Sequence, residues 1–410
     1  MSYAQGARCF HCLKQWPLSQ IQYVCPECQG NVEIIYDYAQ IAKVATREYF
    51  QKNTDFSIWR YEPLLPVQNQ GTIPLQIGWT PLYPMRYYGA ARLYIKDDGR
   101  NPSASFKDRA SAIALLHAKA IGAQQMTGAS TGNAGSSMAC LAASVGMPLV
   151  IFVPEKAPQA KIAQLLIFGA EVILVKGTYD DAFNLCLEVS KKFGWYSRNT
   201  GYNPYTREGK KTCAYEISEQ LHWQAPDWVL VSVGDGNIIS GLWKGFKDLY
   251  QIGLISKLPK LGAIQSRQSN SIAKTIEHYH KTQKLEIQPV AATTIADSIS
   301  VDIPRDGLAA AQAILESKGM PIEVDDTEIL AAIAQTGKQW GIFGEPAGVT
   351  SIAGFNKMEE MHVFPKNATV VCVLTGNGLK DVASAIKTVG KPVCIEPSLS
   401  AVEKVVVKIK

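Results

Sequence analysis

The chain has 410 residues, 47% of them hydrophobic and 19% charged, with a formal net charge of +5. Its Lys and Arg residues form no long run, whereas nucleic-acid-binding proteins concentrate basic residues in a patch or stripe. No apolar stretch is long enough to span a bilayer, and the first 15 residues lack the apolar segment of a signal peptide. The chain has nine cysteines, and an odd number without a secretion signal favours a reducing, cytoplasmic compartment. Together these features favour a protein that binds small molecules and does not bind nucleic acid or membranes.

The N-terminal 35 residues form a distinct segment with two Cys-x2-Cys pairs, separated by twelve residues. A segment this short cannot build its own hydrophobic core, so a bound metal would have to replace one. Tetrahedral zinc with four thiolates suits two such pairs. We therefore predict a zinc ribbon over residues 1–35, with a structural Zn²⁺ bound by Cys9, Cys12, Cys25 and Cys28.

After a connecting region at residues 36–75, short β-rich runs alternate with helical runs, which is typical of α/β proteins with parallel sheets. Strands are predicted at residues 93–96, 149–153, 171–175, 229–233, 261–265 and 370–374. Helices are predicted between them, for example at residues 111–120, 135–145, 179–193 and 329–335. Ligands of open parallel sheets bind at the carboxyl ends of the strands, so the segments that follow strands are the candidates for a functional site.

The first candidate segment is residues 101–109 (NPSASFKDR), which lead from the strand at 93–96 into a helix. Lys107 falls near the start of that helix, where the positive end of the helix dipole disfavours an ammonium and should lower the lysine's pKa. A lowered pKa suits an amine that must attack an aldehyde. Taken alone, a lysine in the first turn of a helix is usually solvated, so this signal depends on the others.

Three further segments could contribute to the same site. Residues 127–137 (TGASTGNAGSS) are small and polar and include Asn133, and residues 374–381 (LTGNGLKD) place Thr375 at a strand end. Residues 233–241 (VGDGNIISG) could bind a phosphate through backbone amides. Each could instead be an ordinary loop with helix caps. The 233–241 loop lacks the G-x-G-x-x-G spacing of a dinucleotide site, which disfavours a nicotinamide-dependent enzyme.

In this order, the four segments resemble the fold type II, tryptophan synthase β-like family of pyridoxal-phosphate (PLP) enzymes, and within it the threonine synthases. The resemblance implies a lyase of threonine biosynthesis that converts O-phosphohomoserine and water to L-threonine and phosphate, by γ-elimination and β-addition of water. It implies that Lys107 holds PLP as a Schiff base and acts as the catalytic residue. It also implies that Asn133 bonds the 3′-oxygen and Thr375 faces the pyridine nitrogen. The backbone amides that would hold the 5′-phosphate belong to Gly234, Asp235, Gly236, Asn237 and Ile238.

One segment departs from the family pattern. Threonine synthases typically carry Asn-Pro-x-Arg-x-Glu-Gly, whose Arg binds the substrate phosphate, but here Thr206 stands at the Arg position and Arg207 follows it. The substrate-binding candidates are Ser130, Thr131, Lys161, Asn203 and Arg207. The departure keeps open a β-replacement on a phosphorylated serine, as in cysteate synthase, or a threonine or serine dehydratase. A zinc-ribbon binding module fused to a catalytically silent body is a further alternative.

The resemblance also suggests how the chain is divided. We expect a zinc ribbon at residues 1–35, a large PLP-binding α/β domain from residues 36–109 and 201–395, and a smaller inserted α/β domain at residues 110–200. Residues 396–410 would form a C-terminal tail. Members of the family are often dimers, so a homodimer is compatible with the resemblance.

Overall fold

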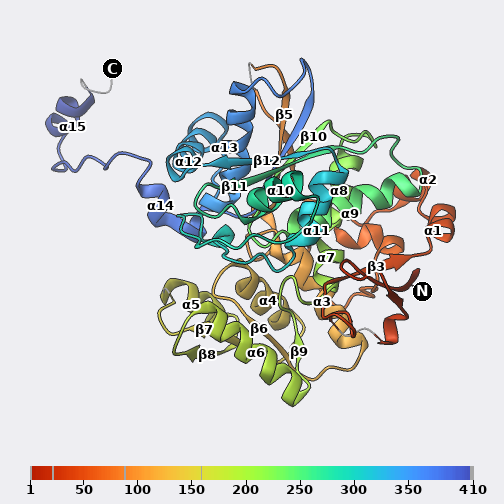
Figure 1. The fold of residues 1–410 in the computed structure, drawn as a ribbon. Coiled ribbons are helices and arrows are strands. Elements are labelled where there is room, and N and C mark those ends of the chain that lie inside the picture. The colour runs from red at the N-terminus through yellow and green to blue at the C-terminus, as the bar shows by residue number, and fades with distance from the viewer. Residues whose placement is uncertain (1, 21–22, 87–88, 158, 407–410) are drawn as a thin grey trace.

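The structure is a computed structural model and describes residues 2–20, 23–86, 89–157 and 159–406. It contains a three-stranded, a six-stranded and a four-stranded sheet, with helices packed around the two larger ones (Figure 1). The predicted α/β class, with two α/β units and a small N-terminal unit, is confirmed. Among the described residues, none of the helices combines the length and apolarity needed to cross a membrane.

The N-terminal unit is an antiparallel sheet of β1 (Ala4–Cys9), β2 (Gln15–Trp16) and β3 (Val32–Tyr36), in the order β2-β1-β3. Its apolar centre is very small and consists of Ala7, Cys9, Cys25 and Val32. Four short helical elements accompany it, namely η1 (Leu18–Gln20), α1 (Tyr38–Val44), α2 (Arg47–Lys52) and η2 (Ile58–Leu64). Asp37 and Thr46 cap α1 and α2 by accepting hydrogen bonds from backbone amides.

The six-stranded sheet has the order β12-β11-β10-β13-β5-β4 and is parallel except for its edge strand β4 (Leu82–Pro84). Its parallel strands are β5 (Arg92–Asp97), β10 (Trp228–Ser232), β11 (Lys260–Ser266), β12 (Met320–Val324) and β13 (Thr369–Leu374). Alternate residues of β10 enter different cores: Val229 and Val231 belong to one apolar cluster and Leu230 to another. Because both faces are covered, the central strands are continuous apolar runs.

Helices cover both faces of this sheet. The helices α8 (Thr212–Gln220), α9 (Asn237–Gln251), α10 (Ser271–Thr282) and α11 (Gly307–Glu316) contribute to the core on one side. The helices α12 (Asp326–Trp340) and α13 (Pro346–Glu360) contribute to the core on the other side. Short turns η3 (Asp98–Arg100) and η4 (Asp297–Ile299) lie in the loops between these elements.

The four-stranded sheet is parallel, with the order β8-β7-β6-β9. Its strands are β6 (Met126–Ala129), β7 (Leu149–Pro154), β8 (Glu171–Val175) and β9 (Tyr196–Ser197), and its helices are α4 (Asn133–Ser144), α5 (Gln159–Ile167) and α6 (Tyr179–Phe193). A capping box of Thr178 and Asp181 begins α6, and Gly194 ends it in the left-handed conformation.

Two helices position the site between these sheets, α3 (Lys107–Ala120) and α7 (Tyr205–Lys210). They pack unusually closely, because a Cβ added at Gly209 would lie 1.9 Å from the carbonyl oxygen of Arg109. The start of α3 is fixed by Arg109, which is buried and donates to Asp98 Oδ2 at 2.6 Å and to Glu216 Oε1 at 2.5 Å. A buried ion-pair network therefore fixes the first turn of α3, in which Lys107 lies two residues before Arg109.

All six predicted strands are found within one residue of their expected bounds. The strands β4, β6, β9 and β12 of the two larger sheets, and β1, β2 and β3 of the N-terminal unit, were not predicted. The chain ends with η5 (Gly378–Asp381), α14 (Val382–Ile386) and α15 (Leu399–Val406). In Figure 1, α15 stands apart from the body of the molecule. Residues 407–410 of the predicted tail at 396–410 lie outside the described part of the chain.

Candidate active site

Lys107 and Thr375 reach the same cavity because their loops are joined by backbone hydrogen bonds. The amide of Phe106 donates to the Thr375 carbonyl at 2.8 Å, and the amide of Asn377 donates to the Ala104 carbonyl at 3.1 Å. The loop before α3 is thereby attached to the end of β13. Lys107 and Thr375 line one cavity together with Asn133 and residues 234–238. These are the residues that the sequence singled out from four separate segments.

Lys107 as a whole residue is half-buried, and the surroundings of its amine favour the neutral form. Burial, together with the nearby guanidinium of Arg198, lowers the pKa of Lys107 to about 8, while Asp235 and Glu345 oppose the shift. The direction agrees with the sequence-based expectation, but its main cause is burial and not the helix dipole. An amine with this pKa is partly neutral near neutral pH and is therefore a competent nucleophile and base.

Residues 234–238 form a cradle between β10 and α9. Gly236 has φ +86°, and a Cβ there would lie 2.6 Å from Ala310 Cβ; a Cβ on Gly234 would lie 2.7 Å from Ile299 Cα. Glycine is therefore required at both positions. Since α9 begins at Asn237, the first amides of that helix have no partner within it and can bind an anion. This donor set fits the phosphate of PLP.

Lys210 supplies a cation beside the cradle. It is 0% exposed, and its Nζ donates to Asn237 Oδ1. Burial, reinforced by the nearby positive charges of Lys107 and Arg198, holds the pKa of Lys210 well below its ordinary value. Within the described chain no carboxylate lies within ion-pair distance of it, so a bound phosphate would supply the missing counter-charge.

Asn133 is the first residue of α4, and Glu345 fixes the orientation of its side chain. Asn133 Nδ2 donates to Glu345 Oε1 at 2.6 Å. Burial raises the pKa of Glu345, against the opposing effect of Lys380 and the Asn133 hydrogen bond. Asn133 Nδ2 also donates to Ser298 Oγ at the long distance of 3.4 Å, and Ser298 lines the same cavity. An oxygen atom in the cavity could take the place of that acceptor, which fits the 3′-oxygen of PLP.

A second cavity of about 510 Å³ opens beside Lys107 and contains Ser130, Thr131, Arg198 and Thr200 in its lining. Arg198 is 1% exposed and donates from Nε to Ser111 Oγ at 3.1 Å and from Nη1 to Thr200 Oγ1 at 2.6 Å. Its Nη2 makes no hydrogen bond to the described residues. Burial lowers the pKa of Arg198 to about 10. A buried cation with a free donor beside a cavity suits an anionic substrate group.

The remaining sequence candidates lie elsewhere. Lys161 forms an ion pair with Asp297 in an adjoining pocket. Asn203 is turned inward and donates to the Tyr196 hydroxyl at 2.9 Å and to the Ser197 carbonyl at 2.8 Å. Arg207 does not face the cavity of Lys107, because its guanidinium pairs with Asp306 and donates to the Val32 carbonyl at 2.9 Å. Arg207 lines a separate pocket against the N-terminal unit instead.

Sequence reasoning missed three charged residues of the site. Arg198 follows β9, whose two residues are too few to give a strand signal. Glu345 lies 212 residues from Asn133 in the sequence, so no local pattern links them. Lys210 could have been found, since residues four apart on a helix share a face and Lys210 is four residues after Thr206. Both side chains contact Asn237 Oδ1.

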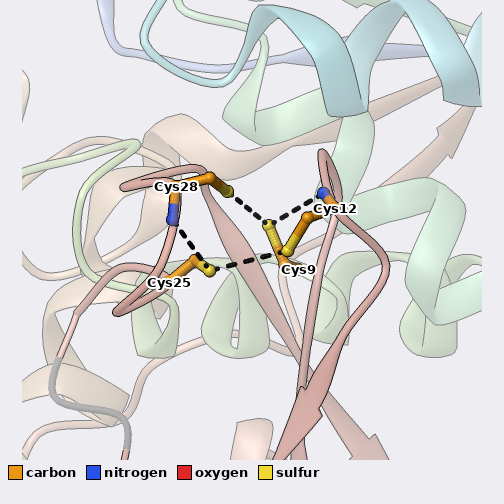
Figure 2. A group of neighbouring side chains, drawn as sticks. All are labelled: Cys9, Cys12, Cys25 and Cys28. Carbon is orange, nitrogen blue, oxygen red and sulfur yellow. Dashed lines mark hydrogen bonds between the residues drawn. The ribbon is translucent and has the colours of Figure 1, made fainter.

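The four N-terminal cysteines form a separate cluster (Figure 2). Their sulfur atoms all lie within 4.8 Å of one another, with Cys9 Sγ 3.5 Å from Cys28 Sγ and Cys12 Sγ 3.7 Å from Cys25 Sγ. Four sulfurs at a zinc–sulfur distance of about 2.3 Å would be about 3.8 Å apart in a tetrahedron. Backbone amides also donate to the sulfurs, as from Cys12 N to Cys9 Sγ at 3.5 Å. This geometry fits a tetrahedral metal ion.

Comparison with known proteins identifies the family. The pyridoxal-phosphate dependent enzyme family matches residues 73–376. The threonine synthase of Methanocaldococcus jannaschii is 38% identical over 404 residues, which are 97% of this chain and 98% of that protein. The threonine synthase of Methanosarcina acetivorans is 34% identical over the same shares of both chains.

Solved structures share the fold. Diaminopropionate ammonia lyase from Escherichia coli has a TM-score of 0.64 at 19% identity, over 85% of this chain and 91% of that one. O-ureido-L-serine synthase has a TM-score of 0.65 at 17% identity, over 77% of this chain and 94% of that one. The chain belongs to the pyridoxal-phosphate dependent enzymes and, at the level of sequence identity, to the threonine synthase family within them.

Proposed function

We propose that the chain is a PLP-dependent threonine synthase, a lyase that converts O-phosphohomoserine and water to L-threonine and phosphate. The observation that carries this proposal is that Lys107, a lysine with a lowered pKa, lines the same cavity as the phosphate cradle at residues 234–238. The adjoining cavity, with the free Nη2 of Arg198, provides room and a cation for a phosphorylated amino acid.

The cofactor would be held by groups from four parts of the chain. The cradle amides and Lys210 would bind its phosphate, Asn133 its 3′-oxygen, Lys107 its aldehyde carbon and Thr375 its ring nitrogen. Bound PLP withdraws electrons from the carbon next to an attached amine, which makes the proton on that carbon easier to remove. Since the Thr375 hydroxyl is neutral, it would not keep the ring nitrogen protonated as a carboxylate would, and this would disfavour side reactions such as transamination.

Lys107 would move the protons. The amine of Lys107, when it is not bonded to the cofactor, would be partly neutral at pH 7 and could remove the α-proton of the substrate. Overall, phosphate leaves the γ-carbon with its bonding electrons, and the β-carbon loses a proton and gains the hydroxyl group of water. The γ-carbon gains a proton to become a methyl group, and the remaining proton of water goes to the phosphate. Because the Lys107 amine can both accept and return protons, it could remove protons from the α- and β-carbons and deliver one to the γ-carbon.

Arg198 would bind the leaving phosphate. The family places an Arg for this purpose where this chain has Thr206, and Arg207 is paired with Asp306 away from the cavity. Arg198 has a donor directed at no described residue, in a buried environment where a charge-assisted hydrogen bond is strong. Ser130 and Thr131 line the same cavity and could complete the site through hydroxyl groups.

A substrate panel tests the proposed reaction. O-phosphohomoserine, O-phosphoserine and threonine would each be incubated with the enzyme, and phosphate release and amino-acid products would be measured together. Threonine and phosphate formed in equal amounts from O-phosphohomoserine support the proposal. Products from O-phosphoserine alone would identify a β-replacement enzyme instead, and a keto acid from threonine would identify a dehydratase.

We also propose that Cys9, Cys12, Cys25 and Cys28 bind one structural Zn²⁺. The sulfur spacing supports this, and the N-terminal sheet has too small an apolar centre to be stable without it. Elemental analysis of purified protein should find about one zinc per chain. The double substitution Cys9→Ser with Cys12→Ser should lose that metal, and a metal-free wild type would refute the assignment.

A further inference from the structure

The side chain of Asn31 makes one of the contacts between the N-terminal unit and the body of the protein. Its Nδ2 donates to the Gly201 carbonyl at 2.5 Å, the Arg305 carbonyl at 2.8 Å and Asp306 Oδ1 at 3.1 Å. Asn31 comes three residues after Cys28, and its own carbonyl accepts from the amide of Phe10 in the first cysteine pair at 2.9 Å. Both cysteine pairs therefore determine where this amide points.

Asp306, which accepts a hydrogen bond from Asn31, also bonds to residues of the phosphate cradle. It is 1% exposed, and its Oδ2 accepts from Asn237 Nδ2 at 2.7 Å and from Ser240 Oγ at 2.5 Å. The Asp306 amide donates to the Asp235 carbonyl at 2.9 Å. One buried carboxylate thus links the N-terminal unit to two residues of the cradle, Asp235 and Asn237.

Arg207 forms a second connection between the same parts. Its guanidinium pairs with Asp306, donates to the Val32 carbonyl of β3 and lies 4.6 Å from the centre of the Phe10 ring. Figure 1 shows β3 beside α7, and the two elements are in contact. Without the N-terminal unit, the buried pair of Arg207 and Asp306 would lose an acceptor and become open to water, which weakens it.

We infer that the metal-closed N-terminal unit is a positioning element for the cofactor's phosphate, acting on the cradle through Asn31 and Asp306. The inference rests on the proposed function, since it concerns the affinity for PLP. Losing the metal would release Asn31, loosen Asp306 and allow Asn237 to turn, although Lys107 itself would be untouched. By thermodynamic linkage, PLP must then raise the affinity for the metal by the same factor that the metal raises the affinity for PLP.

The test measures the dissociation constant of PLP for the full-length protein by absorbance titration. Stripping the metal with a chelator, or the substitution Asn31→Ala, should each raise that constant by about tenfold, the effect of losing one hydrogen bond to a charged group. The matched control is Lys14→Ala, which removes an exposed ion pair to Glu27 within the N-terminal unit and should change nothing. Asn31→Ala keeps all four cysteines, so the test does not require the stripped protein to stay folded.

A competition between the protein and a chelator for zinc provides a second, independent measurement, that of the zinc affinity. Zinc affinity should be higher with PLP bound than without it, and this difference should disappear in Asn31→Ala. An unchanged PLP dissociation constant in both the stripped protein and Asn31→Ala would overturn the inference, as would a zinc affinity that PLP does not alter. A wild-type protein that binds no PLP would refute the proposed function itself, which is a separate result.

Discussion

The rate at which Lys107 captures PLP in the cofactor-free enzyme should rise with pH and level off above about pH 8. Only the neutral amine attacks an aldehyde, so the ammonium must first lose its proton. Burial, helped by Arg198, lowers the pKa of Lys107 from 10.5 to about 8. At pH 7, roughly a tenth of this amine is then neutral, against about 0.03% for an ordinary lysine. The site should therefore react about 300 times faster at that pH than an equally accessible free lysine.

Stopped-flow mixing of the cofactor-free enzyme with PLP, from about pH 6 to about pH 10, measures this profile. Arg198→Leu should move the midpoint to higher pH, because a like charge that disfavours the ammonium is removed. Asp235→Asn should move it to lower pH, because a carboxylate that favours the ammonium is removed. The reaction of PLP with a free lysine analogue over the same range corrects for ionisation of PLP itself.

The reasoning would be refuted by a rate that keeps rising up to pH 10, as for free lysine, since the site would then not lower the pKa of Lys107. A midpoint near 8 that neither substitution moves would locate the cause entirely in burial. Opposite shifts to those expected would mean that the charges around Lys107 are wrongly assigned.

Three further substitutions separate binding from stability. Arg198→Ala should lower kcat/KM for a phosphorylated substrate roughly 10- to 100-fold, because a hydrogen bond to a charged group is lost. Phosphate release measures this value, and an unchanged kcat/KM would exclude a role of Arg198 in binding phosphate. Arg207→Ala should instead lower the free energy of unfolding by about 3–5 kcal/mol, because it leaves Asp306 buried without its counter-charge, and denaturant titration measures this. Lys210→Met should raise the PLP dissociation constant about tenfold through loss of the cation beside Asn237; an unaltered fluorescence titration would contradict this.

The parts of the site that could be predicted are those whose residues lie in short, continuous segments of the sequence. The loop ending in Lys107, the glycine turn of residues 234–238 and the position of Thr375 each follow a strand with a clear apolar pattern. The rule that ligands gather at the carboxyl ends of parallel strands then brings them together. The pairing of distant backbones, such as Phe106 with Thr375, needs only that both loops lie at the same sheet edge.

Which face of α7 points toward the cavity could not be predicted in the same way. Consecutive residues on a helix project about 100° apart, so Arg207 cannot stand in for an Arg at position 206. Thr206 and Lys210 share the face toward Asn237, while Arg207 points to Asp306 and the N-terminal unit. That distinction depends on how the N-terminal unit packs against the body, and no local pattern contains it.

The central claim is that the amine of Lys107 carries the cofactor. Reduction of the PLP-loaded enzyme with borohydride makes the link to the lysine permanent, and peptide mass spectrometry then identifies the modified residue. The account predicts one reduced PLP group per chain, on the peptide that contains Lys107. A cofactor found on Lys210 or another lysine, or no modified peptide in an enzyme that has been loaded with PLP, would contradict it.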